Sequence, residues 1–246
     1  MRSFCSVIFI LLTIIPAELS AVSLPACSVS ADESNVPAEE VLANHQEGLD
    51  ELGRSVSLTR LDEHRRNSKI RLTRAERRAA KDYDTLIVKI EFWEQVKDLK
   101  GSLLSMCGAD PAPDVTTEAD IIAKRVIDTL YSLSQEWRIG SSALFNNFLI
   151  EIGAKEKGYC YHYVTHLKNA LTPLDLKHFD VRWGTAWEKT FRENNALVIT
   201  VKGDSFEKGL AIDAWRMAGR PFWTKVKGDR FPWVEEFNVE ERYEVE

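Results

Sequence analysis

Apolar residues recur at intervals of three and four between Val41 and Leu104, which is the spacing of amphipathic helices. Thr73 followed by Glu76 predicts a capping box, and this places the start of one helix inside the region. The preceding segment 32–40 is polar and contains proline, which is typical of a linker. The first part of the chain is therefore expected to be a helical arm.

A break rich in glycine, proline and aspartate at 108–114 ends this helical region and predicts a domain boundary. Thr117 is expected to cap the next helix, whose apolar residues again share one face. Shorter helices are expected over 143–152 and 160–171. The part of the chain after the break thus begins with helices.

The apolar period then changes to two, which indicates β-strands. One strand is expected around 179–183, and two more over 195–201 and 210–216. The tail 234–246 is rich in glutamate and is expected to be a frayed surface segment. Helices followed by an antiparallel meander predict an α+β fold for this half of the chain.

Residues 1–31 have the composition of a secretory signal peptide. Arg2 supplies a positive charge, and the apolar run 7–15 is too short to span a bilayer, which needs about 20 residues. We therefore expect export, followed by a helical arm over 32–115 and an α+β domain over 116–246.

Two processing routes remain open. Val-Ser-Ala at 29–31 has the small-residue spacing of an ordinary cleavage site, whereas Leu-Pro-Ala-Cys at 24–27 resembles the lipobox of bacterial lipoproteins. In the second case a lipid on Cys27 would anchor the protein to a membrane without spanning it. The mature protein is expected to be periplasmic or lipid-anchored to the bacterial envelope.

The net charge of −6 argues against nucleic acid as a partner, and seven tryptophans indicate a substantial core. The stretch 54–81 departs from this charge, because it holds ten Arg or Lys and three Asp or Glu. It is either a solvated helix face or a surface for anionic lipid or cell-wall polymer. Both interpretations stay open at this point.

Cys160 begins the predicted helix 160–171, where unpaired backbone N–H groups and the helix dipole are expected to lower the pKa of its thiol. Cys107 is the other cysteine of the mature body, and an oxidising compartment would allow the two to pair. A third interpretation makes Cys160 a small buried residue.

The motifs Gly-Tyr-Cys-Tyr-His at 158–162, Glu-Asn-Asn-Ala-Leu-Val at 193–198 and Asp-Ala-Trp-Arg at 213–216 resemble a group of uncharacterised bacterial envelope proteins. Those proteins have a transglutaminase-like core, and the likeness covers roughly residues 117–233. The resemblance implies a transglutaminase-like (papain-like) helix packed on an antiparallel sheet. It also implies that Cys160 is the nucleophile and Asp213 the orienting carboxylate.

The chain departs from the resembled pattern at one residue, because Asn194 stands where histidine is expected. An amide cannot accept a proton at neutral pH, so Asn194 cannot be a general base. If Gly203 and Asp204 form a two-residue turn, Asn194 lies opposite Asp213 with Cβ atoms about 5 Å apart. That register depends on the length of the turn.

The remaining histidines are weak substitutes for the missing base. His162 and His166 lie on other faces of the Cys160 helix, and only His178, on or near a strand, is placed to reach the site. His162 and His166 have the i, i+4 spacing of a metal pair but lack the acidic residue of His-Glu-x-x-His. We therefore expect neither a metal site nor a cofactor.

Two functions follow from these residues. A binding or scaffolding module that kept the fold and lost the chemistry would hold an extended envelope peptide or protein in an aromatic cleft. That cleft would be lined by Trp183, Trp215, Tyr161 and His162. Alternatively, an active cysteine hydrolase or acyltransferase would act on envelope peptides through Cys160 and Asp213. The amide of Asn194 favours the binding module.

Overall fold

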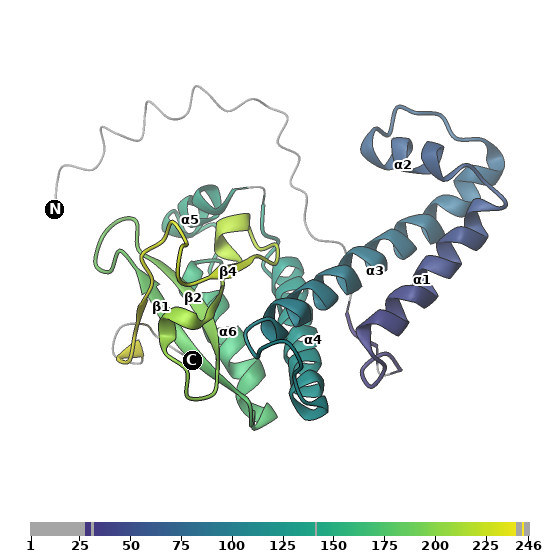
Figure 1. The fold of residues 1–246 in the computed structure, drawn as a ribbon. Helices are drawn as coiled ribbons and strands as arrows, with labels where there is room; N and C mark the ends of the chain where they lie inside the picture. Colours follow the sequence, from purple (N-terminus) through teal and green to yellow (C-terminus); the bar gives the residue numbers. More distant parts are fainter. Residues whose placement is uncertain (1–27, 31, 141, 240–242, 244–246) are drawn as a thin grey trace.

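The structure is a computed structural model that describes residues 28–30, 32–140, 142–239 and 243 (Figure 1). Most of the predicted signal peptide, including Cys27, lies outside the described residues. None of the described helices is both long enough and apolar enough to cross a membrane.

The arm consists of α1 (Ala38–Gly53), α2 (Leu58–Arg66) and α3 (Arg74–Leu104). Figure 1 shows α1 and α3 side by side, with α2 at the end that lies away from the sheet. The predicted capping box is confirmed, since Thr73 Oγ1 accepts from the N–H of Glu76 at 3.2 Å and Glu76 Oε2 accepts from the N–H of Thr73 at 2.7 Å. Capping satisfies N–H groups that a helix start leaves unpaired.

Three more helices follow: α4 (Pro113–Glu136), α5 (Ala143–Glu151) and α6 (Cys160–Leu171). The prediction that Thr117 caps α4 is wrong, because the helix begins four residues earlier at Pro113. Proline is favoured in the first turn, where its missing N–H costs nothing. Thr117 instead donates its hydroxyl to the Pro113 carbonyl at 2.9 Å, inside the helix.

The sheet has five antiparallel strands in the order β4-β3-β2-β1-β5. Their bounds are β1 (Phe179–Ala186), β2 (Asn194–Val201), β3 (Leu210–Ile212), β4 (Trp223–Lys225) and β5 (Val234–Glu235). The third strand is shorter than predicted, because the chain turns into a 3-10 helix at Trp215–Met217. In the described part of the chain the fold is thus α+β, with six α-helices followed by an antiparallel sheet.

The expectation of a frayed tail is wrong for its described part. The strand β5 pairs with β1, and Val239 is buried in the main core. A segment that pairs with a sheet edge and buries an apolar side chain a few residues later is held in place.

The two faces of the sheet bury different clusters, because successive strand residues point to opposite sides. Leu197 and Ile199 of β2 join the main core, which also contains apolar residues of α3, α4 and α6. Ala196 and Val198 face a smaller cluster that includes Phe206, Phe231 and Trp233. The predicted arm and the α+β domain therefore share one core through α3.

Candidate functional site

Cys160 is the first residue of α6, as the sequence predicts. The backbone reaches this point through Gly158, whose φ of 130° lies in a region that other residues rarely adopt. A side chain at Gly158 would also meet Ile139 Cδ1 at 3.3 Å. This glycine therefore allows the loop to deliver Cys160 to the helix start, where it stays partly exposed.

The side chain that faces the thiol is Asn195, whose Nδ2 donates to Cys160 Sγ at 3.5 Å. Asn195 lies on the same face of β2 as Leu197, which packs toward α6. Its Oδ1 accepts from Trp183 Nε1 at 2.7 Å and from Thr185 Oγ1 at 3.0 Å. These two donors fix the amide so that its nitrogen points at the sulfur.

Burial raises the pKa of Cys160 to about 11, and the nearby charge of Asp213 acts in the same direction. Hydrogen bonds from the side chain and backbone of Asn195 and from the backbone of Tyr161 oppose this shift and do not overcome it. The expectation of a lowered pKa at the helix start is therefore wrong, because desolvation of the charged form outweighs the helix terminus. At neutral pH the thiol is protonated.

Asn194 and Asp213 do meet, although the predicted register between their strands is wrong. Leu197 pairs with Ile212, so extending the ladder by one residue places Ala196, and not Asn194, opposite Asp213. A 3-10 turn at Phe206–Lys208 takes the place of the expected two-residue turn and shifts the register by two. Asn194 Nδ2 nevertheless donates to Asp213 Oδ2 at 2.8 Å.

Asp213 is held by Arg216 on the face of the sheet opposite α6. Arg216 donates its backbone N–H to Oδ1 at 3.1 Å and its Nε–H to Oδ2 at 2.9 Å. The guanidinium also binds both carboxylate oxygens of Asp229, at 3.0 and 2.7 Å, and lies 3.9 Å from the ring centroid of Phe231. Asp213 is thus a member of a charged cluster rather than a direct partner of Cys160.

The pKa values in this cluster follow from burial and pairing. Burial raises the pKa of Asp213, and the charge and hydrogen bonds of Arg216 oppose that rise. Burial acts to raise the pKa of Asp229 too, but hydrogen bonds from Arg216 and Trp233 bring it below its ordinary value. The two carboxylates raise the pKa of Arg216 in spite of its desolvation.

The histidines near the site have other contacts. His162 Nδ1 accepts the backbone N–H groups of Gly158 and Tyr159 at 3.0 and 3.2 Å, so it caps α6. Burial, together with the charge of Lys157, lowers the pKa of His162 to about 4. His166 packs against the ring of Trp137 with centroids 5.2 Å apart.

The sequence predicts that His178 is the histidine best placed to reach the site, and the structure puts it elsewhere. Its Nε2 lies 3.1 Å from Asp114 Oδ2. It precedes β1, seven residues before Thr185, which is about 23 Å along an extended strand. His178 therefore sits at the far end of the sheet from Cys160.

The predicted aromatic cleft is only partly assembled. Tyr161 and Trp183 both stack on Tyr243, with ring centroids 5.0 and 5.4 Å apart. Trp215 instead turns toward α5, where its Nε1 donates to Asn147 Oδ1 at 3.1 Å. Sequence reasoning missed Tyr243, because nothing in a glutamate-rich tail indicates that it returns to the helix start.

Cys107 and Cys160 are both free thiols, so the disulfide considered from the sequence is not formed between them. Cys107 Sγ donates to the Leu103 carbonyl at 3.6 Å, just beyond the end of α3. Burial raises the pKa of Cys107, as it does that of Cys160. Neither thiol has the electropositive surroundings of a reactive cysteine.

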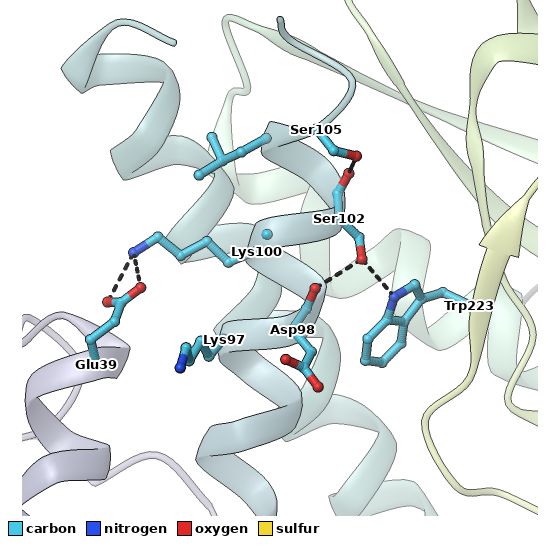
Figure 2. A pocket seen from close by; sticks show the side chains of 9 residues that line it. Glu39, Lys97, Asp98, Lys100, Ser102, Ser105 and Trp223 are labelled. Atoms are coloured by element: carbon cyan, nitrogen blue, oxygen red, sulfur yellow. Dashed lines mark hydrogen bonds and ion pairs between the residues drawn. The ribbon is translucent and has the colours of Figure 1, made fainter. Parts of the chain in front are cut away.

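A separate hollow of about 690 Å³ lies beside α1, α3 and β4 (Figure 2). Figure 2 shows Lys100 reaching Glu39, at 3.0 and 3.1 Å from its two carboxylate oxygens. Trp223 Nε1 donates to Ser102 Oγ at 3.0 Å, and that hydroxyl donates to the Asp98 carbonyl at 2.9 Å. These polar groups satisfy one another and include no nucleophile with an adjacent base.

Within the described part of the chain, no group of three or more His, Cys, Asp or Glu side chains is arranged to hold a metal ion. The chain was also compared with protein-family models, with curated proteins and with solved structures, and none of the three comparisons gave a match. The functional argument therefore rests on the site itself.

Proposed function

We propose that this protein is an exported cell-envelope protein with a degenerate transglutaminase-like thiol site that binds a peptide or protein ligand without cleaving it. The sequence of residues 1–31 supports export, and the motifs around Cys160, Asn194 and Asp213 support the transglutaminase-like assignment. In this proposal the protein is a pseudoenzyme, because the fold that positions the thiol remains while the proton acceptor is missing.

The proposal depends mainly on which side chain forms a hydrogen bond with the thiol of Cys160. An amide nitrogen, Asn195 Nδ2, faces Cys160 Sγ at 3.5 Å. No imidazole in the described residues hydrogen-bonds to that sulfur, and the nearest one in sequence, His162, uses its Nδ1 to cap α6. Thiol catalysis needs a thiolate and an acid–base partner within hydrogen-bond reach, and this arrangement supplies neither.

The test is the pH dependence of alkylation at Cys160. A Cys107→Ser chain is treated with iodoacetamide, and the modification of Cys160 is followed by mass spectrometry between pH 6 and pH 10. We expect a rate that keeps rising up to the alkaline end, because burial raises the pKa of Cys160 to about 11. A rate that levels off near pH 7 would end the proposal and favour the hydrolase.

Asn195→His is the matched variant, and Asn194→His, on the opposite face of β2, is its control. Asn195→His puts an imidazole on the face that meets Cys160, where Asn195 Nδ2 lies 3.5 Å from Sγ. If the site has lost only its base, alkylation at pH 7 should become about tenfold faster than in the parent chain. Cys160→Ala, in contrast, should leave ligand binding unchanged.

A further inference from the structure

The chain places one of its own tyrosines against the aromatic side chains at the Cys160 helix. Tyr243 stacks on Tyr161 with an interplanar angle of 20° and on Trp183 with an angle of 16°. These two partners come from α6 and β1, so the ring contacts both the helix and the sheet. We call the surface formed by Tyr161 and Trp183 the aromatic slot.

The hydroxyl of Tyr243 is recognised as well as the ring. It donates to Glu193 Oε1 at 2.6 Å and lies 3.0 Å from Asn195 Oδ1. Asn195 is the residue whose Nδ2 reaches Cys160. A single amide therefore connects the tyrosine in the slot with the thiol at the helix start.

The segment that carries Tyr243 is attached to the edge of the sheet. The strand β5 pairs with β1, the N–H of Glu236 donates to the Trp183 carbonyl at 2.9 Å, and Val239 is buried. Beside this segment a hollow of about 350 Å³ remains, lined in part by Lys168, Trp183 and residues 235–239. The slot is thus filled by a ring, while the space next to it can take more of an extended chain.

We propose that the aromatic slot is a binding site for a tyrosine-bearing peptide segment of a partner protein, and that Tyr243 is its internal competitor. This inference rests on the proposed function and names its ligand class. The bound ring shows the chemistry that the site selects, namely a phenol whose faces stack and whose hydroxyl reaches a carboxylate.

An internal competitor lowers the apparent affinity for an outside ligand. A tethered group has an effective concentration on the order of 1 mM. A peptide that binds the empty slot with a Kd of about 10–100 µM would then bind the parent chain about 10- to 100-fold more weakly. Removal of the Tyr243 ring should therefore increase the affinity for a peptide supplied from outside.

The test uses a fluorescein-labelled synthetic peptide with the sequence of residues 236–246 and measures its fluorescence polarisation with the full chain. We expect the Tyr243→Ala chain to bind the peptide at least about tenfold more tightly than the parent chain. A peptide with alanine in place of its tyrosine should bind neither chain. Leu144→Ala is the control, because Leu144 is 73% exposed on α5, outside the slot and the hollow, and should leave the parent affinity unchanged.

A second variant checks the slot itself. Tyr161→Ala, added to Tyr243→Ala, should weaken peptide binding about tenfold by removing one stacking partner. Equal peptide affinity of the parent and Tyr243→Ala chains would overturn the inference, as would a Tyr243→Ala chain that keeps its near-UV circular dichroism and binds no peptide. Mixed dimers of parent and Tyr243→Ala chains would also overturn it, in favour of a second copy as the occupant.

The alkylation assay on the same samples separates the two proposals. If Cys160 is alkylated slowly at neutral pH and no peptide binds, only the inference about the aromatic slot is contradicted. A Cys160 that reacts rapidly at neutral pH contradicts the proposed function, whichever result the peptide gives.

Discussion

Asn194 and Asn195 are neighbours on β2, and they serve two sites that differ in charge. Asn195 lies on the α6 face, where its partners Cys160, Trp183 and Thr185 are all neutral at pH 7. Asn194 binds Asp213 on the opposite face, in a cluster of two carboxylates and one guanidinium. One residue step along a strand therefore separates an uncharged thiol site from a buried ionic network.

The difference in charge indicates how much each face of the sheet contributes to the stability of the fold. A buried ion pair is costly to break, because the remaining charge has lost its solvent and its partner. Neutral hydrogen bonds are individually weaker, and groups around them adjust more easily. We therefore expect the ionic face to be the structural support and the neutral face to tolerate change.

The largest effect is predicted for Arg216→Ala. The change leaves Asp213, which is 1% exposed, and the buried Asp229 without their shared cation. The expected loss is about 3–5 kcal/mol in the free energy of unfolding, measured by urea denaturation. Lys208→Ala is the control, because its ion pair with Asp204 is exposed and should contribute less than about 1 kcal/mol. A loss for Arg216→Ala as small as that of the control would contradict the assignment of this face as the support.

A smaller effect is predicted for Asn195→Ala. The variant removes the acceptor of the buried Trp183 N–H, and the expected loss is about 2 kcal/mol in the free energy of unfolding. Thr200→Val on the same strand is the control, because the buried Thr200 hydroxyl has no hydrogen-bond partner among the described residues. Its loss should be close to zero, and equal losses for the two variants would show that the Asn195 contacts contribute nothing.

The same two faces show what the sequence predicts well and what it does not. The helix that starts at Cys160 and the first strand around Trp183 are local features, and periodicity with turn residues predicts both. The α+β order follows from the change of period along the chain. Contacts within a few residues, such as the Thr73 capping box, are predicted for the same reason.

The partners across the sheet could not be predicted in the same way. A 3-10 turn between β2 and β3 shifted the register by two residues, and no local pattern reports the length of such a turn. Asn195 and Tyr243 are 48 residues apart, and their contact depends on β5 joining the edge of the sheet. The candidate site is therefore built mostly from long-range geometry, which residue spacing does not encode.

The smallest predicted effect is the loss of folding stability at low pH, and it is expected to differ between the two faces of the sheet. The pKa of His162 falls from 6.5 in the unfolded chain to about 4 in the fold, so between these values the unfolded chain binds more protons. The stability that the fold gains by keeping His162 neutral is therefore complete above pH 6.5 and is lost as the pH falls toward 4. The partial exposure of the ring limits the loss to about 1–2 kcal/mol.

His162→Gln tests this prediction, because glutamine can still cap the helix start through its side-chain oxygen and does not titrate. The variant should lose less stability between pH 6.5 and 4 than the parent chain, in urea unfolding at each pH. The stability of the variant still falls with pH, because burial lowers the pKa of His45 and of His166 as well. The quantity to compare is therefore the difference in stability loss between the two chains. Asp229 on the ionic face behaves differently, because its pKa is lowered and its charge is therefore lost only when the pH falls below about 4. Parallel pH curves for the two chains would show that His162 does not carry the acid sensitivity of the α6 face.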